Sequence, residues 1–230
     1  MANALIVGAS RGIGLGLVRE FLARGWSVTA TVRGDRGAGE LQKLATASDG
    51  RLRIETVDIA EVASGEALRD RLAGDAFDLV LVNAGVGGPL GKNPRTVSRD
   101  EFADLMVTNA LGPVRLAELL GKQGRPQSGV VAVMSSQLGS VANNTTGGTE
   151  LYRASKAALN SLARSFAARH RDKGLAVLAL HPGWVRTDMG GPNAAIDVET
   201  SAKGIANVVE RAQGDRRSGF FDYKGDELPW

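Results

Sequence analysis

Short apolar runs alternate with helical patterns along the whole chain of 230 residues. Seven of the short runs favour strands, and between them apolar residues recur at the spacing of amphipathic helices. The predicted strands are Ala4–Val7, Val28–Val32, Leu52–Val57, Leu79–Asn83, Val130–Ser135, Leu175–His181 and a shorter Gly219–Tyr223. The predicted helices are Ile13–Arg24, Ala38–Thr46, Val62–Leu72, Arg99–Gly121, Leu151–Arg169 and Val198–Arg211. This alternation predicts an α/β fold in which a parallel sheet carries helices on both faces.

Two polar loops stand out because both follow predicted strands at their carboxyl ends. They are residues 84–96 and residues 137–150, and the second contains the sequence NNTTGG. Ligands of open α/β sheets bind at that edge, so we expect the functional site there. No linker rich in Pro, Gly or Ser divides the chain, and we predict one domain over residues 1–230.

Composition narrows the classes of protein that the chain could represent. Hydrophobic residues make up 43% of the chain and can bury a sizeable core. The absence of cysteine excludes disulfides and thiolate metal sites, and His170 and His181 alone do not make a metal site. The net charge is +3, but Arg216 and Arg217 are only a pair, so we predict no nucleic-acid partner. No stretch approaches the ~18 apolar residues of a membrane span, and we expect a cytoplasmic protein.

A glycine-rich segment follows the first predicted strand directly and leads into a helix. Residues 8–14 read GASRGIG, which is the spacing G-x-x-x-G-x-G. Glycines permit a tight turn against a pyrophosphate, and the helix N-terminus supplies N–H donors and a positive dipole. We therefore predict a dinucleotide site, although a glycine-rich turn can also serve only to pack a strand on a helix.

The end of the second predicted strand indicates which dinucleotide binds. An acidic residue there would select NAD, but the strand ends at Val32 and Arg33, and Asp35 comes later in the loop. Arg33 and Arg11 offer two cations for a 2′-phosphate, which predicts NADP(H) rather than NAD(H). The alternative is that Arg33 is a solvated loop residue.

Tyr152 and Lys156 lie four residues apart on a predicted helix and so share one face. An ammonium beside a phenol favours the phenolate and lowers the pKa of the phenol. A phenol tuned in this way can exchange a proton with a reacting oxygen near neutral pH. Alone, such a pair also fits a tyrosine that anchors the helix beside a solvated lysine.

With the glycine turn, Asn83–Gly85 (NAG) and Tyr152-x-x-x-Lys156 present in this order, the chain resembles the short-chain dehydrogenase/reductase family. It is most similar to the C-factor-like and sniffer-like carbonyl reductases, through the segments Met134–Ser140, Asn144–Gly148 and Tyr152–Lys156. The resemblance covers essentially the whole chain. It implies a single-domain, Rossmann-type, doubly wound parallel sheet with strand order 3-2-1-4-5-6-7, and a homodimer or homotetramer.

The resemblance also implies roles for individual residues. The implied catalytic residues are Asn109, Ser136, Tyr152 and Lys156. The implied cofactor-binding residues are Gly8, Ser10, Arg11, Gly12, Ile13, Gly14, Arg33, Asp58, Ile59, Asn83, Ala84, Gly85, Tyr152, Lys156, Pro182, Gly183, Val185 and Thr187. Asp58 is expected on the adenine, Val185 and Thr187 on the carboxamide of nicotinamide, and Asn109 beside a water. The 16 residues from Ser136 to Tyr152 exceed the spacing of many relatives, so Ser135 stays an alternative to Ser136.

These expectations combine into an enzyme that moves a hydride between NADP(H) and a carbonyl or alcohol substrate. Ser136 would hydrogen-bond the substrate oxygen, Tyr152 would donate the proton, and Lys156 would bind the nicotinamide ribose. Trp184 and Leu138 are candidates to line the substrate site, next to a short lid at residues 188–198. The alternative from another class is an NADP(H)-binding signalling or regulatory protein of the C-factor type, in which turnover is secondary.

Overall fold

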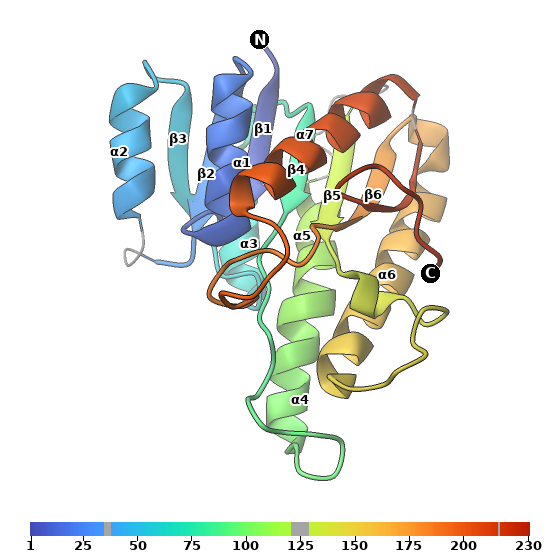
Figure 1. Ribbon diagram of the computed structural model, residues 1–230. Helices are drawn as coiled ribbons and strands as arrows, with labels where there is room; N and C mark the ends of the chain where they lie inside the picture. Colours follow the sequence, from blue (N-terminus) through green and yellow to red (C-terminus); the bar gives the residue numbers. More distant parts are fainter. Residues whose placement is uncertain (35–37, 121–128, 216) are drawn as a thin grey trace.

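The computed structural model describes residues 1–34, 38–120, 129–215 and 217–230 (Figure 1). Within these ranges, seven strands form one sheet in the order β3-β2-β1-β4-β5-β6-β7, and every neighbouring pair is parallel. The strands are β1 (Asn3–Val7), β2 (Ser27–Val32), β3 (Leu52–Thr56), β4 (Leu79–Val82), β5 (Val130–Met134), β6 (Ala176–His181) and β7 (Gly219–Asp222). The predicted fold class and strand order are confirmed.

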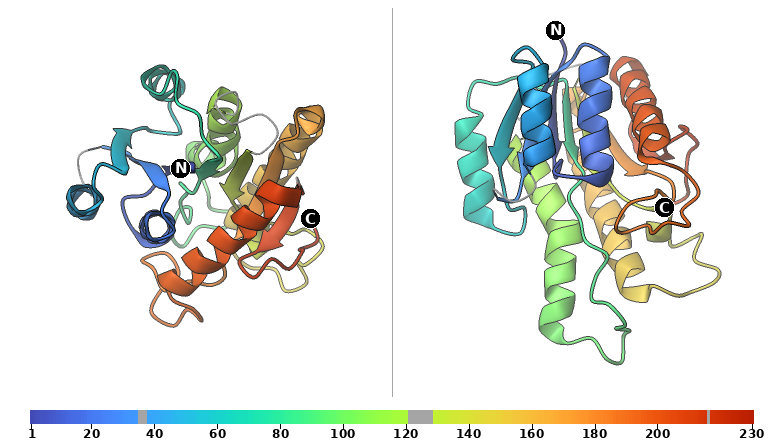
Figure 2. Two further views of the ribbon diagram at one scale, coloured as in Figure 1. Left: turned by 90° about the horizontal axis from the view of Figure 1, so that it is seen from above. Right: turned by 60° about the vertical axis from the view of Figure 1, so that its left-hand side comes forward.

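Helices cover both faces of this sheet, as Figure 2 shows from above. They are α1 (Gly12–Ala23), α2 (Gly39–Ala47), α3 (Val62–Arg71), α4 (Arg99–Met106), α5 (Gly112–Leu120), α6 (Glu150–Arg169) and α7 (Val198–Asp215). Helices α1, α2 and α7 pack on one face, and α3, α5 and α6 on the other. In β1, Ala4 and Ile6 face the first core and Leu5 and Val7 the second, which is why the strand is apolar throughout. Among the described helices, none is long and apolar enough to cross a bilayer.

The predicted helix Arg99–Gly121 is wrong as a continuous α-helix. A capping box at Ser98 starts α4, but a π-helical segment, η1 (Val107–Leu111), separates it from α5. The π turn holds one residue more than an α turn and so changes which side chains face the sheet. Close packing accompanies it, because a Cβ on Gly112 would lie 2.5 Å from the carbonyl oxygen of Ile59. The predicted end at Gly121 lies outside the described residues.

Strands β3, β4, β5 and β7 each end one residue earlier than predicted, and in the first three the chain stays close to the sheet at the next residue. The next residues, Val57, Asn83 and Ser135, still donate backbone hydrogen bonds to the neighbouring strand, at 2.9, 2.9 and 2.7 Å. The chain then turns out of the sheet into loops. These loops gather at the carboxyl edge, which is the lower edge of the sheet in Figure 1. The residues that leave the sheet at this edge form the walls of the site.

Candidate active site

A cleft of about 600 Å³ lies at the carboxyl edge, between the turn after β1, the ends of β2 to β6 and helix α6. Most of the predicted site residues line it: Gly8, Ser10, Arg11, Gly12, Ile13, Arg33, Asp58, Ile59, Asn83, Ala84, Gly85, Tyr152, Lys156, Pro182 and Thr187. A second cavity of about 560 Å³, between α6 and β7, contains none of them. In the described part of the chain no group of three or more acidic or histidine side chains could hold a metal ion.

The glycine turn forms the cleft wall at the start of α1. Gly8 has φ +82°, and a Cβ on it would lie 2.8 Å from Ala84. The side-chain amide of Asn83 donates to the Gly8 carbonyl at 2.8 Å and ties the turn to the end of β4. Gly14 does not line the cleft, and a Cβ on it would lie 2.1 Å from the Gly8 oxygen. Gly14 therefore packs the helix on the turn, while the other glycines leave backbone open to a pyrophosphate.

The two arginines of the cleft differ in their surroundings. Arg33 follows β2 with an exposed side chain, and none of the described residues pairs with its guanidinium. Arg11 pairs with Asp188, which comes from the segment after β6. Asp35, the acidic residue weighed against Arg33 in the sequence, lies outside the described residues. Among the described groups at this end of the cleft, an anion would therefore meet two cations. Arg33 has no partner among them, and Arg11 is paired.

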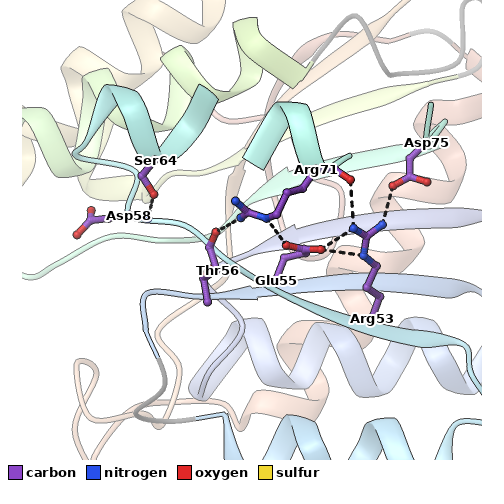
Figure 3. Close-up of polar contacts among 7 residues, drawn as sticks. All are labelled: Arg53, Glu55, Thr56, Asp58, Ser64, Arg71 and Asp75. Atoms are coloured by element: carbon purple, nitrogen blue, oxygen red, sulfur yellow. Dashed lines mark hydrogen bonds and ion pairs between the residues drawn. The ribbon is translucent and has the colours of Figure 1, made fainter. Parts of the chain in front are cut away.

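Asp58 lies in the turn after β3, where its own backbone is held in place. Its N–H donates to the hydroxyl of Ser64 at 2.9 Å (Figure 3). Its carboxylate accepts the N–H of Ala60 at 2.9 Å. One carboxylate oxygen is engaged in this way. The other can accept from a donor in the cleft, as an adenine amino group would require.

An ion-pair network fixes the strand that leads to Asp58. Arg71 of α3 donates to Glu55 at 2.7 Å and to the Thr56 carbonyl at 2.6 Å, and Arg53 bridges Glu55 and Asp75 (Figure 3). Burial alone would raise the pKa of Glu55, but its hydrogen bonds to Arg71 and Arg53 hold that pKa below its ordinary value. The network joins α3 to the edge strand β3 and so orders the turn that carries Asp58.

Tyr152 and Lys156 share one face of α6, as their spacing predicts, and both line the cleft. The Lys156 Nζ lies 5.8 Å from the centroid of the Tyr152 ring and donates to the Met134 carbonyl at 2.8 Å. Only 4% of Lys156 is exposed, and this burial lowers its pKa to about 8.

The predicted lowering of the Tyr152 pKa by Lys156 is wrong. Burial raises the pKa of Tyr152 above 10.0, and a hydrogen bond with the Ser136 hydroxyl opposes that rise only in part. The loss of hydration outweighs the nearby groups, so the phenol stays protonated at neutral pH.

The two serines after β5 point to different partners. Ser136 contacts the phenol of Tyr152, and its hydroxyl accepts the N–H of Leu138 at 3.1 Å. Ser135 is buried and donates to Asn160 of α6 at 2.6 Å. Ser136 therefore reaches the phenol, whereas the Ser135 hydroxyl is engaged away from it. Ser135 lines the cleft and Ser136 does not, so Ser136 borders the cleft only through its contact with Tyr152.

Asn109 lies in the π segment η1, fully buried, and does not line the cleft. Its amide nitrogen donates to the Val86 carbonyl at 2.8 Å and to the Ser155 hydroxyl at 3.0 Å, and its oxygen accepts the Val86 N–H at 2.8 Å. Both amide hydrogens are thus used. The side chain fastens the loop after β4 to α6 beside Tyr152.

The segment after β6 contributes in part as predicted. Pro182 and Thr187 line the cleft, but Gly183 and Val185 do not. Gly183 has φ +85°, and a Cβ on it would lie 2.6 Å from Ile196, while Val185 is buried and bridges to Ile196. These two residues shape the segment instead of facing the cleft.

Sequence reasoning missed several residues of the cleft wall. They are Val7, Val32, Val57, Ala60, Val86, Thr108, Met134 and Arg186. Ser135, the alternative to Ser136, and Asp188 and Met189, the first residues of the predicted lid, also line the cleft. Thr108 comes from the π segment, which a helical pattern does not reveal. Arg186 directly precedes the predicted Thr187, so the position of that motif after a strand of the parallel sheet was the available signal.

The fold and the cleft define a nucleotide-binding enzyme of the doubly wound class, and comparison with known proteins identifies its family. The family model described as short chain dehydrogenase matches residues 2–196. The chain therefore belongs to the short-chain dehydrogenase family and is an oxidoreductase, as the sequence motifs predicted.

Three similar proteins support the resemblance to the C-factor-like and sniffer-like members. C-signal of Myxococcus xanthus is 42% identical over 159 residues, which are 66% of this chain and 92% of that protein. A carbonyl reductase from Pseudomonas aeruginosa PAO1, crystallised in complex with NADP, is 44% identical with a TM-score of 0.92, and both chains are fully covered. The carbonyl reductase Sniffer of D. melanogaster is 31% identical with a TM-score of 0.92, again over both whole chains.

Proposed function

We propose that this protein is an NADP(H)-dependent carbonyl reductase built as one domain over residues 1–230. The observation that carries the proposal is the polar cluster around Tyr152 and Lys156, both of which line the cleft. There the Ser136 hydroxyl contacts the protonated phenol of Tyr152, and the buried ammonium of Lys156 lies beside the same ring. The cluster faces a cleft whose opposite wall is a glycine turn, so a nucleotide and a reacting oxygen fit side by side.

The cofactor proposal rests on the cations of the cleft. Arg33 and Arg11 supply charge for a 2′-phosphate, and no described acidic residue occupies the end of β2 where NAD selection would require one. The NADP complex of the similar Pseudomonas aeruginosa enzyme supports this choice. The turn from Gly8 to Ile13 would hold the pyrophosphate, Asp58 and Ile59 the adenine, Asn83–Gly85 the adenosine side, and Pro182 and Thr187 the nicotinamide.

In the proposed reaction, bound NADPH supplies the hydride. Ser136 donates a hydrogen bond to the substrate oxygen, where negative charge develops. Tyr152 gives that oxygen its proton, and the raised pKa of the phenol keeps this proton in place until the oxygen becomes basic. Lys156 keeps further N–H donors besides the one on Met134, and we assign them to the ribose hydroxyls. A water near Asn109 would donate a hydrogen bond to an oxygen of that residue, because both hydrogens of the side-chain amide are already used.

The rim of the cleft favours an uncharged, apolar carbonyl substrate. Exposed apolar side chains lie on the loops after β4, β5 and β6: Val86, Leu90, Val141, Trp184 and Met189. Of these, Val86 and Met189 line the cleft, whereas Trp184 and Leu138, the two candidates from the sequence, do not. Arg186, the arginine of the wall after β6, donates to Ala194 and pairs with Asp197 at 3.5 Å. A substrate carboxylate would have to break that pair, whereas a neutral ester or aromatic ketone would contact the apolar rim without such a cost.

The test is oxidation of NADPH, followed by its absorbance, with a panel of aldehydes, ketones, diketones and quinones. The panel contains matched pairs of keto esters and keto acids. We expect turnover with neutral members, and a 10²–10⁴-fold loss in Tyr152→Phe, the usual effect of removing a general acid. A Tyr152→Phe protein within about threefold of the parent would refute the scheme, and equal rates on esters and acids would refute the substrate class.

A second function is favoured by one specific observation, the similarity to C-signal of Myxococcus xanthus. In that case the fold would bind NADP(H) for a signalling or regulatory role, and turnover would be secondary. Tight NADPH binding with no turnover across the panel would support this function. For either function we expect a cytoplasmic homodimer or homotetramer.

A further inference from the structure

An ion pair joins two walls of the cleft. The Arg11 guanidinium, in the turn between β1 and α1, binds the Asp188 carboxylate, in the segment after β6. The same two walls approach at the next residues, because a Cβ on Gly12 would lie 3.4 Å from Thr187. Arg11 and Asp188 both line the cleft. Their pair therefore spans the side of the cleft that holds the predicted nucleotide residues.

The Asp188 side of this bridge is built on a fixed backbone. The Thr187 hydroxyl accepts the N–H of Gly190 at 3.1 Å, and the Thr187 carbonyl accepts the N–H of Gly191 at 2.8 Å. The indole of Trp184 donates to the Gly190 carbonyl at 2.9 Å. These bonds fold residues 184–191 onto themselves around Asp188. The longer arginine side chain, with more rotatable bonds, is the partner that can turn to a new anion.

We propose that Asp188 is a specificity-determining residue for the cofactor, because it competes with the 2′-phosphate of NADP(H) for Arg11. The inference rests on the proposed role of Arg11 toward that phosphate. A phosphate carries more charge than a carboxylate and three acceptor oxygens, so it takes Arg11 over. Binding of NADP(H) then costs the Arg11–Asp188 pair, whereas binding of NAD(H) leaves the pair intact. Asp188 thus reduces the factor by which the protein binds NADP(H) more tightly than NAD(H).

Arg33 provides the internal contrast. None of the residues that the structure describes pairs with its guanidinium, so none of them competes with a phosphate there. Among the described residues, the two cations that the sequence treats alike are therefore unequal, because only Arg11 has a carboxylate partner.

The experiment measures dissociation constants of NADP⁺ and NAD⁺ by titration calorimetry for Asp188→Asn, Arg11→Ala and the double variant. Asp188 and Arg11 side chains are 77% and 78% exposed, so neither change opens a cavity in the core. The matched control is Glu227→Gln, which removes an exposed carboxylate that pairs with Arg217, and neither of these two residues lines the cleft. We expect Asp188→Asn to bind NADP⁺ about two- to fivefold more tightly, the range for one exposed ion pair, and NAD⁺ as before.

The cycle separates this proposal from a general charge effect. In the Arg11→Ala background, Asp188→Asn should change neither affinity, and Glu227→Gln should change neither affinity in the parent. Unchanged or weaker NADP⁺ binding in Asp188→Asn overturns the proposal, and so does an equal gain for both cofactors that persists without Arg11. If Arg11→Ala itself leaves NADP⁺ affinity unchanged, the proposed role of Arg11 fails first, and this inference fails with it.

Discussion

The two ends of the cleft are built in opposite ways. At the end assigned to the adenosine phosphate, the charged side chains of Arg11, Arg33 and Asp188 are exposed. At the end assigned to the reaction, Lys156 is 4%, Ser136 8% and Asn109 0% exposed, and each has hydrogen-bond partners from the protein. One end presents charges to water, and the other holds polar groups in a fixed network.

This difference determines how each end responds to change. Exposed charges keep their hydration and are screened by salt, so each one contributes modestly. Buried polar groups have lost their hydration, so removing one partner leaves another group unsatisfied at full cost. We therefore expect large, pH-dependent effects at the reaction end and smaller, salt-dependent effects at the phosphate end.

The strongest test of the buried end compares the two neighbouring serines. Ser136→Ala should lower kcat by about 10²–10³-fold, the usual effect of losing a donor to a developing oxyanion. Ser135→Ala should leave kcat within about threefold, because the Ser135 hydroxyl is engaged with Asn160. It should instead lower the free energy of unfolding by about 1–3 kcal/mol, since it leaves the buried Asn160 oxygen without a donor. Turnover and urea unfolding of both variants test this assignment. A large loss of kcat in Ser135→Ala with little loss in Ser136→Ala would assign the catalytic role to Ser135.

Lys156→Met tests the cost of burying a charge at the same end. The pKa of Lys156 is lowered from 10.5 to about 8, so the unfolded chain binds more protons than the folded protein between these pH values. Stability of the parent should therefore rise with pH across this window, by about 3 kcal/mol in all.

The methionine variant does not titrate there, so its stability relative to the parent should be greatest below pH 8 and fall toward pH 10.5. Losing the hydrogen bond to the Met134 carbonyl shifts the whole curve without changing its slope. Urea unfolding of both proteins at several pH values measures the difference. A stability difference that is independent of pH would show that Lys156 keeps its ordinary pKa in the folded protein.

Sequence reasoning reached the architecture because the signals for it are local. Apolar runs such as Leu79–Val82 are buried on both faces, so their length and their alternation with helices are enough to predict a covered parallel sheet. The glycine turn and the Tyr152–Lys156 pair are also local, and both lie in the cleft as predicted.

What the sequence did not predict depends on contacts between distant segments. The π segment around Asn109 is hydrogen-bonded to Val86 and Ser155 and is followed by close packing against the Ile59 backbone. None of these residues is near it in the chain. The raised pKa of Tyr152 follows from burial, which spacing along a helix does not report. The Arg11–Asp188 pair joins residues 177 positions apart. In each case tertiary packing decides the chemistry of a locally recognisable residue.

At the exposed end, Arg33→Ala measures the charge that selects the cofactor. Loss of one charge-assisted contact to the 2′-phosphate should raise the KM for NADPH by about 10- to 100-fold and leave the KM for NADH within about twofold. Arg169→Ala is the matched control, because it removes an exposed arginine that pairs with Glu118 on α5, outside the cleft wall. Equal increases for NADPH and NADH would remove Arg33 from the 2′-phosphate site.

A change of ionic strength should give the smallest effect on the kinetic constants. It distinguishes the exposed end of the cleft from the buried end in the unmodified protein. Raising salt from about 50 to about 500 mM shortens the range of exposed charges, so the KM for NADPH should rise several-fold. The kcat should change little, since Lys156, Ser136 and Asn109 are shielded from ions by the protein around them. Steady-state rates across a salt series provide both values. Arg33→Ala should make the KM for NADPH depend less steeply on salt and leave the salt dependence of kcat unchanged. A kcat that follows salt as steeply as KM would mean that the reaction end is open to solvent ions, and the contrast between the two ends would fail.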